Sequence, residues 1–236
     1  QVVMVGESDS NKDSGSVASR WALHESQRRL VEIGREHDIA ISFFHGRGGT
    51  VSRGGGNLVL GILGAPPETV NGFLRLTEQG EVINQKYGVR FLALRNLELV
   101  SGATLLYSMN RAAQGLDEEE NEILSFMAGQ SRQRVRGMVY DDPGFPAYFR
   151  GTTPIDVIEQ LNIGSRPSRR KKTEGIGDLR AIPWVFAWTQ SRVNLPSWYG
   201  VGTGLRDWLS EDESHLALLQ EMYQTWPLCR TLFENV

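Results

Sequence analysis

Four short apolar runs in this sequence end abruptly in polar or glycine-containing clusters, and this pattern constrains the fold more than any other feature. The runs cover residues 2–5, 39–44, 73–76 and 182–188. Buried parallel strands are continuous apolar runs in sequence, and functional side chains often follow at their carboxyl ends. Helical patterns lie between the runs. The sequence therefore predicts a helix-rich α/β protein whose site lies at the strand ends.

Three segments between or after these runs predict amphipathic helices. The first carries an apolar stripe that begins at Val17 and ends near Ile33. The second begins near Asp117, because Asp117 and Glu120 have the spacing of a capping box. The third begins near Ser210. Positions expected on the buried sides of the second and third helices are Ile123, Leu124, Met127, Val135, Met138, Leu216, Leu219, Met222 or Tyr223, and Trp226.

Composition argues against several classes of protein. With 25 Lys and Arg against 28 Asp and Glu, the net charge of −3 creates no overall field that favours nucleic acid or an anionic membrane. No apolar stretch approaches the roughly 18–20 residues of a membrane span. Cys229 is the only cysteine, which rules out an internal disulfide framework and favours a reducing cytoplasm. We expect a cytoplasmic protein with no nucleic-acid or membrane partner, so any anion site must be local.

The sharpest local signal is the stretch HGRGGTVSRGGG at residues 45–56, which holds six glycines and two arginines. Glycine allows successive backbone N–H groups to converge on an anion, while Arg47 and Arg53 supply forked donors that match phosphate or carboxylate. His45, at the end of a predicted strand, is placed to donate to the same anion or to transfer a proton. The alternative is a flexible turn with two solvated arginines and a packed histidine. No Gly-Lys-Ser/Thr follows, which weakens a nucleotide-triphosphate interpretation.

Two further clusters have the residue types of an anion or metal site. The string SDSNKDSG follows the first run directly. Its Asp9 can hold a hard divalent cation and its Lys12 can contact an anion, although such strings also cap helices. The basic segment 166–172 is either anion-binding or solvated surface. Arg180 immediately precedes the apolar run at 182–188, where an arginine needs an anion or a carboxylate as partner.

Six strings, in order along nearly the whole chain, resemble the successive signatures of the phosphoenolpyruvate carboxylase family. They are VMVGESDSNKDSG, FFHGRGGTVSRGGG, LRLTEQGEVINQKYG, YFRGTTP, GSRPSRR and LRAIPWVFAWTQSRVNLPSWYGVG. The resemblance implies a helix-rich α/β fold built around a (β/α)8, TIM-like barrel, of which residues 1–236 form a partial catalytic barrel domain. It also implies that the full-length enzyme is a homotetramer with a dicarboxylate effector.

The same resemblance implies a carbon–carbon lyase reaction, the carboxylation of phosphoenolpyruvate with bicarbonate to oxaloacetate and phosphate, with Mg²⁺ or Mn²⁺ as cofactor. The implied roles, which we expect to converge on one face, are a metal ligand at Asp9, catalytic groups at Lys12, His45, Arg47 and Arg53, and substrate-binding arginines at Arg47, Arg166 and Arg180. A non-catalytic phosphate- or dicarboxylate-binding regulatory module remains the alternative. Four predicted strands cannot close a barrel of eight, so we expect the chain alone to be inactive.

Overall fold

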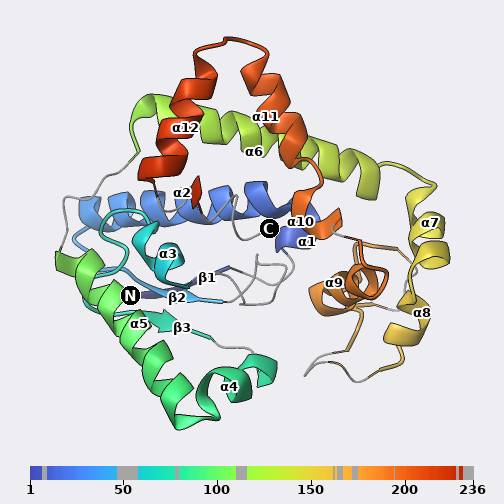
Figure 1. The fold of residues 1–236 in the computed structure, drawn as a ribbon, viewed down its shortest axis with the longest axis horizontal. Coiled ribbons are helices and arrows are strands. Elements are labelled where there is room, and N and C mark those ends of the chain that lie inside the picture. Colours follow the sequence, from blue (N-terminus) through green and yellow to red (C-terminus); the bar gives the residue numbers. More distant parts are fainter. Residues whose placement is uncertain are drawn as a thin grey trace.

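The structure is a computed structural model, and it describes residues 1–6, 10–46, 58–77, 80–109, 116–161, 163, 167–171, 175–193, 195–226 and 229–230. Helices dominate these residues (Figure 1). Within this described part, no helix has the length and apolar character needed to cross a membrane. The helices are α1 (Ser10–Ser14), α2 (Ser16–Glu36), α3 (Leu58–Leu63), α4 (Gly80–Tyr87), α5 (Arg90–Met109), α6 (Glu118–Val139), α7 (Phe145–Thr152), α8 (Ile155–Ile158), α9 (Ala181–Gln190), α10 (Leu195–Trp198), α11 (Val201–Leu209) and α12 (His215–Thr225).

Three short parallel strands form the sheet, in the order β1 (Val2–Val5), β2 (Ser42–His45) and β3 (Arg75–Leu76). The first predicted strand is confirmed, and the second and third are shorter than the apolar runs. Ile39 lies outside β2, because its N–H donates to the carbonyl of Gly34 near the end of α2, at 2.7 Å. The described residues therefore form a small parallel sheet and no closed barrel.

The prediction of a fourth strand at residues 182–188 is wrong, because these residues form helix α9. A short apolar run has the same appearance in a buried helix as in a buried strand. Pro183 lies in the first turn of α9, where its missing N–H leaves no helical hydrogen bond unmade. Trp184 and Trp188, four residues apart, lie on the same side of the helix with ring centroids 5.5 Å apart.

The first two predicted helices are confirmed as α2 and α6. Helix α6 begins with the expected capping box, in which the Glu120 N–H donates to Asp117 Oδ1 at 2.8 Å and the Asp117 N–H donates to Glu120 Oε2 at 3.0 Å. The third prediction placed its helix too early, because Ser210 closes α11 and α12 begins at His215. Its Leu216 is exposed rather than buried. Met222 and Trp226 are buried as predicted.

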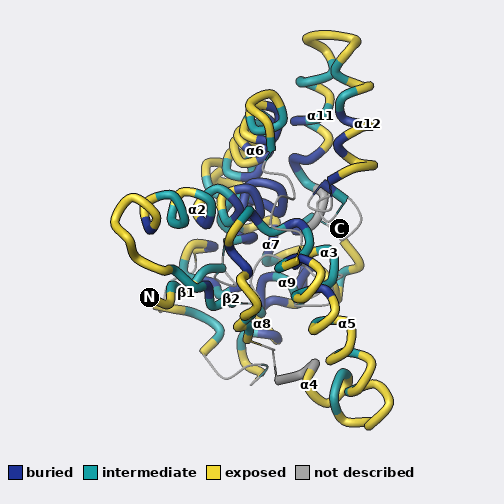
Figure 2. The backbone as a smooth tube through the Cα atoms, turned by 90° about the vertical axis from the view of Figure 1, so that its left-hand side faces the viewer, coloured by how far each residue is buried: buried dark blue, intermediate teal, exposed yellow. Residues whose placement is uncertain are grey.

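Two apolar clusters meet along α6 and form most of the core. One joins α6 to α2, α11 and α12, and it includes the buried Cys229. The other joins the carboxyl-terminal part of α6 to α7, α8 and α9 around the rings of Phe149, Trp184 and Trp188. In Figures 1 and 2, α2 lies between α6 and the sheet. The strands run toward the side of the molecule that carries α1 and α9 (Figure 1), so the strand ends face these two helices.

Candidate functional site

The carboxyl ends of β1 and β2 approach each other closely. His45 is the last residue of β2, the central strand. The Gly46 N–H donates to the Val5 carbonyl at 2.8 Å, and the Thr77 N–H donates to the His45 carbonyl at 2.9 Å. A Cβ atom on Gly6 would lie 2.8 Å from the Gly46 carbonyl oxygen. Glycine is therefore required at this crossing, and a larger residue would push the strand ends apart.

His45 is placed as a neutral ring at this edge. It pairs with Val5 on one side and with Leu76 on the other. Burial lowers the pKa of the His45 imidazole below its ordinary value of 6.5. At neutral pH the ring is uncharged, so one of its nitrogens can accept a hydrogen bond or a proton.

Lys12, on the short helix α1, is buried, with its side chain 2% exposed. Its ammonium lies 2.8 Å from Asp13 Oδ1 and 3.1 Å from the hydroxyl of Tyr140. It also lies 3.3 Å from the carbonyl oxygen of Ile176 and 3.5 Å from that of Gly177. A lysine in the core requires such partners, and here they join α1 to the segment that leads into α9.

Arg180 lies three residues beyond Gly177 and directly precedes α9. Its backbone N–H donates to the Ser168 carbonyl at 3.0 Å, and the Ile176 and Gly177 carbonyls accept from Lys12. Hydrogen bonds therefore hold residues 176–180 at both ends. Its Nε is buried, and among the described residues it has no hydrogen-bond partner. A buried guanidinium nitrogen without a partner is costly, and an anionic oxygen would satisfy it.

Four of the predicted site residues, Asp9, Arg47, Arg53 and Arg166, lie outside the described residues. The structure thus places Lys12 beside the segment that carries Arg180, and places His45 at a strand end. It leaves the wider prediction of one shared face untested.

The basic segment 166–172 has a structural role in its described part. Arg169 pairs with Glu159, with Nη2 to Oε1 at 2.5 Å, and it donates through Nη1 to the Gly175 carbonyl at 2.8 Å. Arg169 and Leu179 also form an antiparallel bridge. Arg169 therefore holds the segment around Arg180 in place.

The described residues do not supply a ready metal site. They contain no group of three or more His, Cys, Asp or Glu side chains arranged to hold a metal ion. Asp13, the described carboxylate that follows Asp9 most closely, is bonded to Lys12 and accepts from the Tyr140 hydroxyl at 2.6 Å. One oxygen of Asp13 is thus bonded within the protein, and Asp9, the metal ligand that the sequence suggests, lies outside the described residues.

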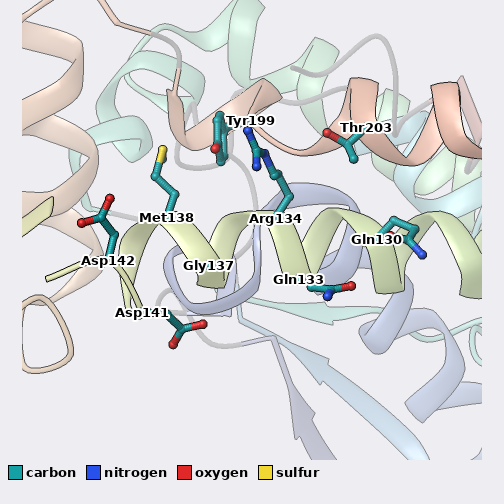
Figure 3. Close-up of a pocket in the computed structure, with 9 residues that line it drawn as sticks. All are labelled: Gln130, Gln133, Arg134, Gly137, Met138, Asp141, Asp142, Tyr199 and Thr203. Carbon is teal, nitrogen blue, oxygen red and sulfur yellow. The ribbon is translucent and has the colours of Figure 1, made fainter. Parts of the chain in front are cut away.

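A separate pocket of about 630 Å³ lies between α6 and α11 (Figure 3). Arg134 reaches from α6 toward the ring of Tyr199, 5.8 Å from the ring centroid. Asp141 and Asp142 line one end. None of the predicted site residues is among its described lining residues, so the pocket is distinct from the strand-end site.

Comparison with known proteins decides the family. A sequence model described as phosphoenolpyruvate carboxylase matches residues 1–236, the whole chain. The chain belongs to the phosphoenolpyruvate carboxylase family. Proteins named phosphoenolpyruvate carboxylase from Nostoc sp., Corynebacterium efficiens and Xanthomonas campestris pv. campestris are 46%, 47% and 48% identical to it. These matches cover 100% of this chain but 23%, 26% and 26% of the relatives, so the chain spans about a quarter of their length.

Sequence reasoning missed three residues that surround Lys12 in this member of the phosphoenolpyruvate carboxylase family. Asp13 and Tyr140 bond to its ammonium, and Arg136 donates to the Asp13 carbonyl at 3.4 Å. Asp13 was visible as an acidic neighbour of Lys12. Tyr140 lies 128 positions away, and no motif or spacing in the sequence links it to Lys12.

Proposed function

We propose that the full-length protein is a phosphoenolpyruvate carboxylase, and that residues 1–236 form a partial catalytic domain of its (β/α)8 barrel. The family match over the whole chain supports this. The main structural observation in support of an anion site is Arg180, whose buried Nε has no hydrogen-bond partner in the described part of the chain. It follows a segment bonded to Lys12. The Arg180 guanidinium can therefore bind a phosphate or carboxylate, and the buried Lys12 adds a positive charge fixed beside the same segment.

The proposed reaction needs this concentration of positive charge. An oxygen of bicarbonate attacks the phosphorus of phosphoenolpyruvate, and the bond from phosphorus to the enol oxygen breaks, which gives carboxyphosphate and the enolate of pyruvate. Carboxyphosphate then divides into phosphate and carbon dioxide, and the enolate carbon attacks carbon dioxide to form oxaloacetate. The reactants are all anions, so cationic groups must neutralise and position them.

Each predicted site residue has a part in this scheme. Arg47, Arg166 and Arg180 bind the phosphate of phosphoenolpyruvate, and Lys12 adds a fixed positive charge beside it. Arg53, in the glycine-rich stretch, covers the reacting groups and keeps water from protonating the enolate. His45, kept neutral by burial, accepts the proton of bicarbonate as its oxygen attacks phosphorus.

The cofactor in this proposal is Mg²⁺ or Mn²⁺, with Asp9 as one of its ligands. Hard divalent cations prefer carboxylate oxygens, which fits an aspartate directly after a strand. When bound, such an ion stabilises negative charge on a reacting oxygen. We propose that its other ligands come from the remainder of the longer protein, together with the homotetramer, a dicarboxylate effector and a cytoplasmic location.

The deciding experiment is an assay of the purified full-length protein for bicarbonate-dependent oxaloacetate formation with Mg²⁺ present. We expect turnover in the parent protein, and a loss of about 10²–10³ in rate for Arg180→Ala, which removes one preorganised cationic donor. Arg206→Ala is the matched control, because Arg206 is an exposed arginine of α11. An absence of oxaloacetate from the parent would refute the carboxylase function and leave the binding-module alternative.

The isolated chain provides a second test of the same proposal. Because the described residues close no barrel and supply no metal site, we expect it to form no oxaloacetate from both substrates and Mg²⁺. It is expected to bind phosphoenolpyruvate weakly through the arginine-glycine stretch. Turnover in a preparation free of full-length enzyme would mean that the reaction needs fewer residues than proposed.

A further inference from the structure

The hydroxyl of Tyr140 completes a closed set of hydrogen bonds around Lys12. It accepts from the Lys12 ammonium at 3.1 Å and donates to Asp13 Oδ1 at 2.6 Å, while the ammonium donates to the same oxygen at 2.8 Å. An ammonium has three N–H donors and no acceptor. The three donors of Lys12 are thus all directed at protein acceptors, which are Asp13, Tyr140 and the carbonyls of Ile176 and Gly177.

Tyr140 is itself fixed in place from its own helix. It is the C-cap residue directly after α6, and its N–H donates to the Arg136 carbonyl at 2.8 Å. The Arg136 guanidinium lies 4.9 Å from the centroid of the Tyr140 ring, and the Lys12 ammonium lies 5.6 Å from it. Cations over an aromatic face are attracted to it. The ring is therefore a fixed support from which the hydroxyl reaches Lys12 and Asp13.

These bonds connect the end of β1 to the segment that carries Arg180. Lys12 and Asp13 lie on α1, a few residues beyond β1. The Ile176 carbonyl that accepts from Lys12 also accepts from the Leu179 N–H at 3.1 Å, one residue before Arg180. A shift of Lys12 would therefore move the turn that sets the position of the Arg180 guanidinium.

We propose that Tyr140 is a positioning residue that fixes Arg180 for substrate through Lys12 and Asp13. The proposal rests on the carboxylase function, in which Arg180 binds the phosphate of phosphoenolpyruvate. Tyr140 acts without touching substrate. Its hydroxyl holds the Lys12 ammonium toward the Ile176 carbonyl, and this holds the turn at residues 176–179 in the form that presents Arg180.

Tyr140→Phe in the full-length protein tests this role, because the variant keeps the ring and its contacts with Arg136 and removes only the hydroxyl. Hydrogen bonds to charged groups are strong enough that their loss changes an equilibrium about tenfold or more. We expect the KM for phosphoenolpyruvate to rise about tenfold, because a displaced Arg180 binds phosphate less well. A purely structural effect would reduce the folded fraction, which lowers kcat and leaves KM unchanged.

Amide hydrogen exchange supplies a readout that does not depend on activity. In Tyr140→Phe the amides of Leu179 and Arg180, which donate to the Ile176 and Ser168 carbonyls, should exchange faster than in the parent protein. Asp13→Asn removes the negative charge that Lys12 and Tyr140 contact, so it should also raise the KM and speed exchange at Leu179 and Arg180. It replaces Tyr140→Phe if that variant does not fold.

Tyr107→Phe is the matched control. It also removes a buried tyrosine hydroxyl, which bonds to the Pro66 carbonyl in a different cluster. We expect its KM to stay within about twofold of the parent value and its exchange at Leu179 and Arg180 to be unchanged. If Tyr140→Phe behaves like this control, the positioning role is refuted.

The remaining outcomes are also decisive. A raised KM without faster exchange at Leu179 and Arg180 would mean that the hydroxyl acts by another route, and the proposal would be wrong. If the parent protein makes no oxaloacetate, the carboxylase function fails separately. Exchange then decides by itself whether Tyr140 holds the segment, with faster exchange in support and unchanged exchange against.

Discussion

The residues around α6 and those around α5 differ in how completely they bury apolar side chains. In α6, Ile123, Leu124 and Met127 are almost wholly buried between α2, α11 and α12. In α5, Phe91 is 81% exposed, and most of the other apolar residues of the helix are exposed as well. Much of α5 has the colour of exposed residues in Figure 2. Within the described part of the chain, α6 therefore buries its apolar side, whereas α5 leaves most of its apolar residues exposed.

The two helices also differ in how their apolar residues are distributed along the sequence. Helix α6 has charged and apolar faces, with its capping box at one end. Helix α5, RFLALRNLELVSGATLLYSM, has apolar residues around its whole circumference. Such a helix is typical of a protein interior. The chain spans about a quarter of its relatives, so in the longer protein we expect α5 to be covered by other segments.

The prediction with the largest expected effect tests this difference directly. One aromatic ring is removed from each region, and the free energy of unfolding is compared. Trp188→Ala should lower the free energy of unfolding by about 3–5 kcal/mol, because Trp188 is 1% exposed and packs on Phe145, Phe149 and Trp184. Phe91→Ala is the matched substitution on α5 and should change it by less than about 0.5 kcal/mol. Urea unfolding of the 236-residue chain measures both. Equal losses would remove the distinction between the two regions.

The second prediction concerns activity, for which we expect the largest losses at the strand ends, outside the two regions compared above. In the full-length protein, Arg47→Ala should lower turnover by about 10²–10³, equivalent to about 3–4 kcal/mol, with little change in stability. Arg53→Ala should instead uncouple the reaction, so that phosphate release exceeds oxaloacetate formation. Phosphate and oxaloacetate are measured in the same sample. Equal losses of both products in Arg53→Ala would contradict its covering role.

Sequence predicted the packed region better than the exposed one, for physical reasons. The stripe of α2 and the capping box of α6 are local signals, and both helices formed where expected. The run at 182–188 failed because burial on all sides removes the periodicity that separates a helix from a strand. No helix was predicted at α5, because its apolar residues lie around the whole circumference and leave no amphipathic pattern.

The site was predictable only where neighbouring residues define it. His45 at a strand end and Lys12 after β1 followed from strings of a few residues. The contacts of Lys12 with Tyr140 and Ile176 join positions 128 and 164 residues apart. Such contacts depend on how α6 and the segment before α9 pack together. No local pattern in a single sequence contains that information.

The third prediction uses pH to probe the packed region through His24 on α2. Its ring stacks on Trp21 at 5.4 Å and meets Trp226 edge-on at 5.6 Å, and among the described residues its Nδ1 has no hydrogen-bond partner. Burial lowers the pKa of His24 from 6.5 to about 4. The charge of Glu25 raises this pKa by a smaller amount, and the charge of Arg28 lowers it. The charged ring is therefore disfavoured in the folded chain.

The sign of the pH effect follows from this pKa. Between about pH 6.5 and about pH 4 the unfolded chain binds a proton at His24 that the folded chain does not, so stability falls as pH decreases. Each pKa unit is worth about 1.4 kcal/mol, so the loss approaches about 3 kcal/mol at pH 4. His24→Phe should flatten the fall in the thermal midpoint over this range, and His37→Phe, at an exposed position, should not. A His24→Phe profile that matches the parent would show that the buried ring does not carry the effect.

The smallest expected effect on stability comes from charged residues placed on the open face of α5. Leu97 and Leu94 are 56% and 55% exposed. Leu97→Lys should therefore change the free energy of unfolding of the isolated chain by less than about 0.5 kcal/mol. An exposed apolar face favours association between copies, so the same change should shift the isolated chain toward monomer. Sedimentation of the variant and parent chains at several concentrations measures this.

The same substitution should have a large effect on stability in the full-length protein. If other segments cover α5 there, the lysine at position 97 is buried and carries a desolvation cost, so Leu97→Lys should lower the free energy of unfolding by several kcal/mol. A variant that is well tolerated in both contexts would show that nothing covers α5.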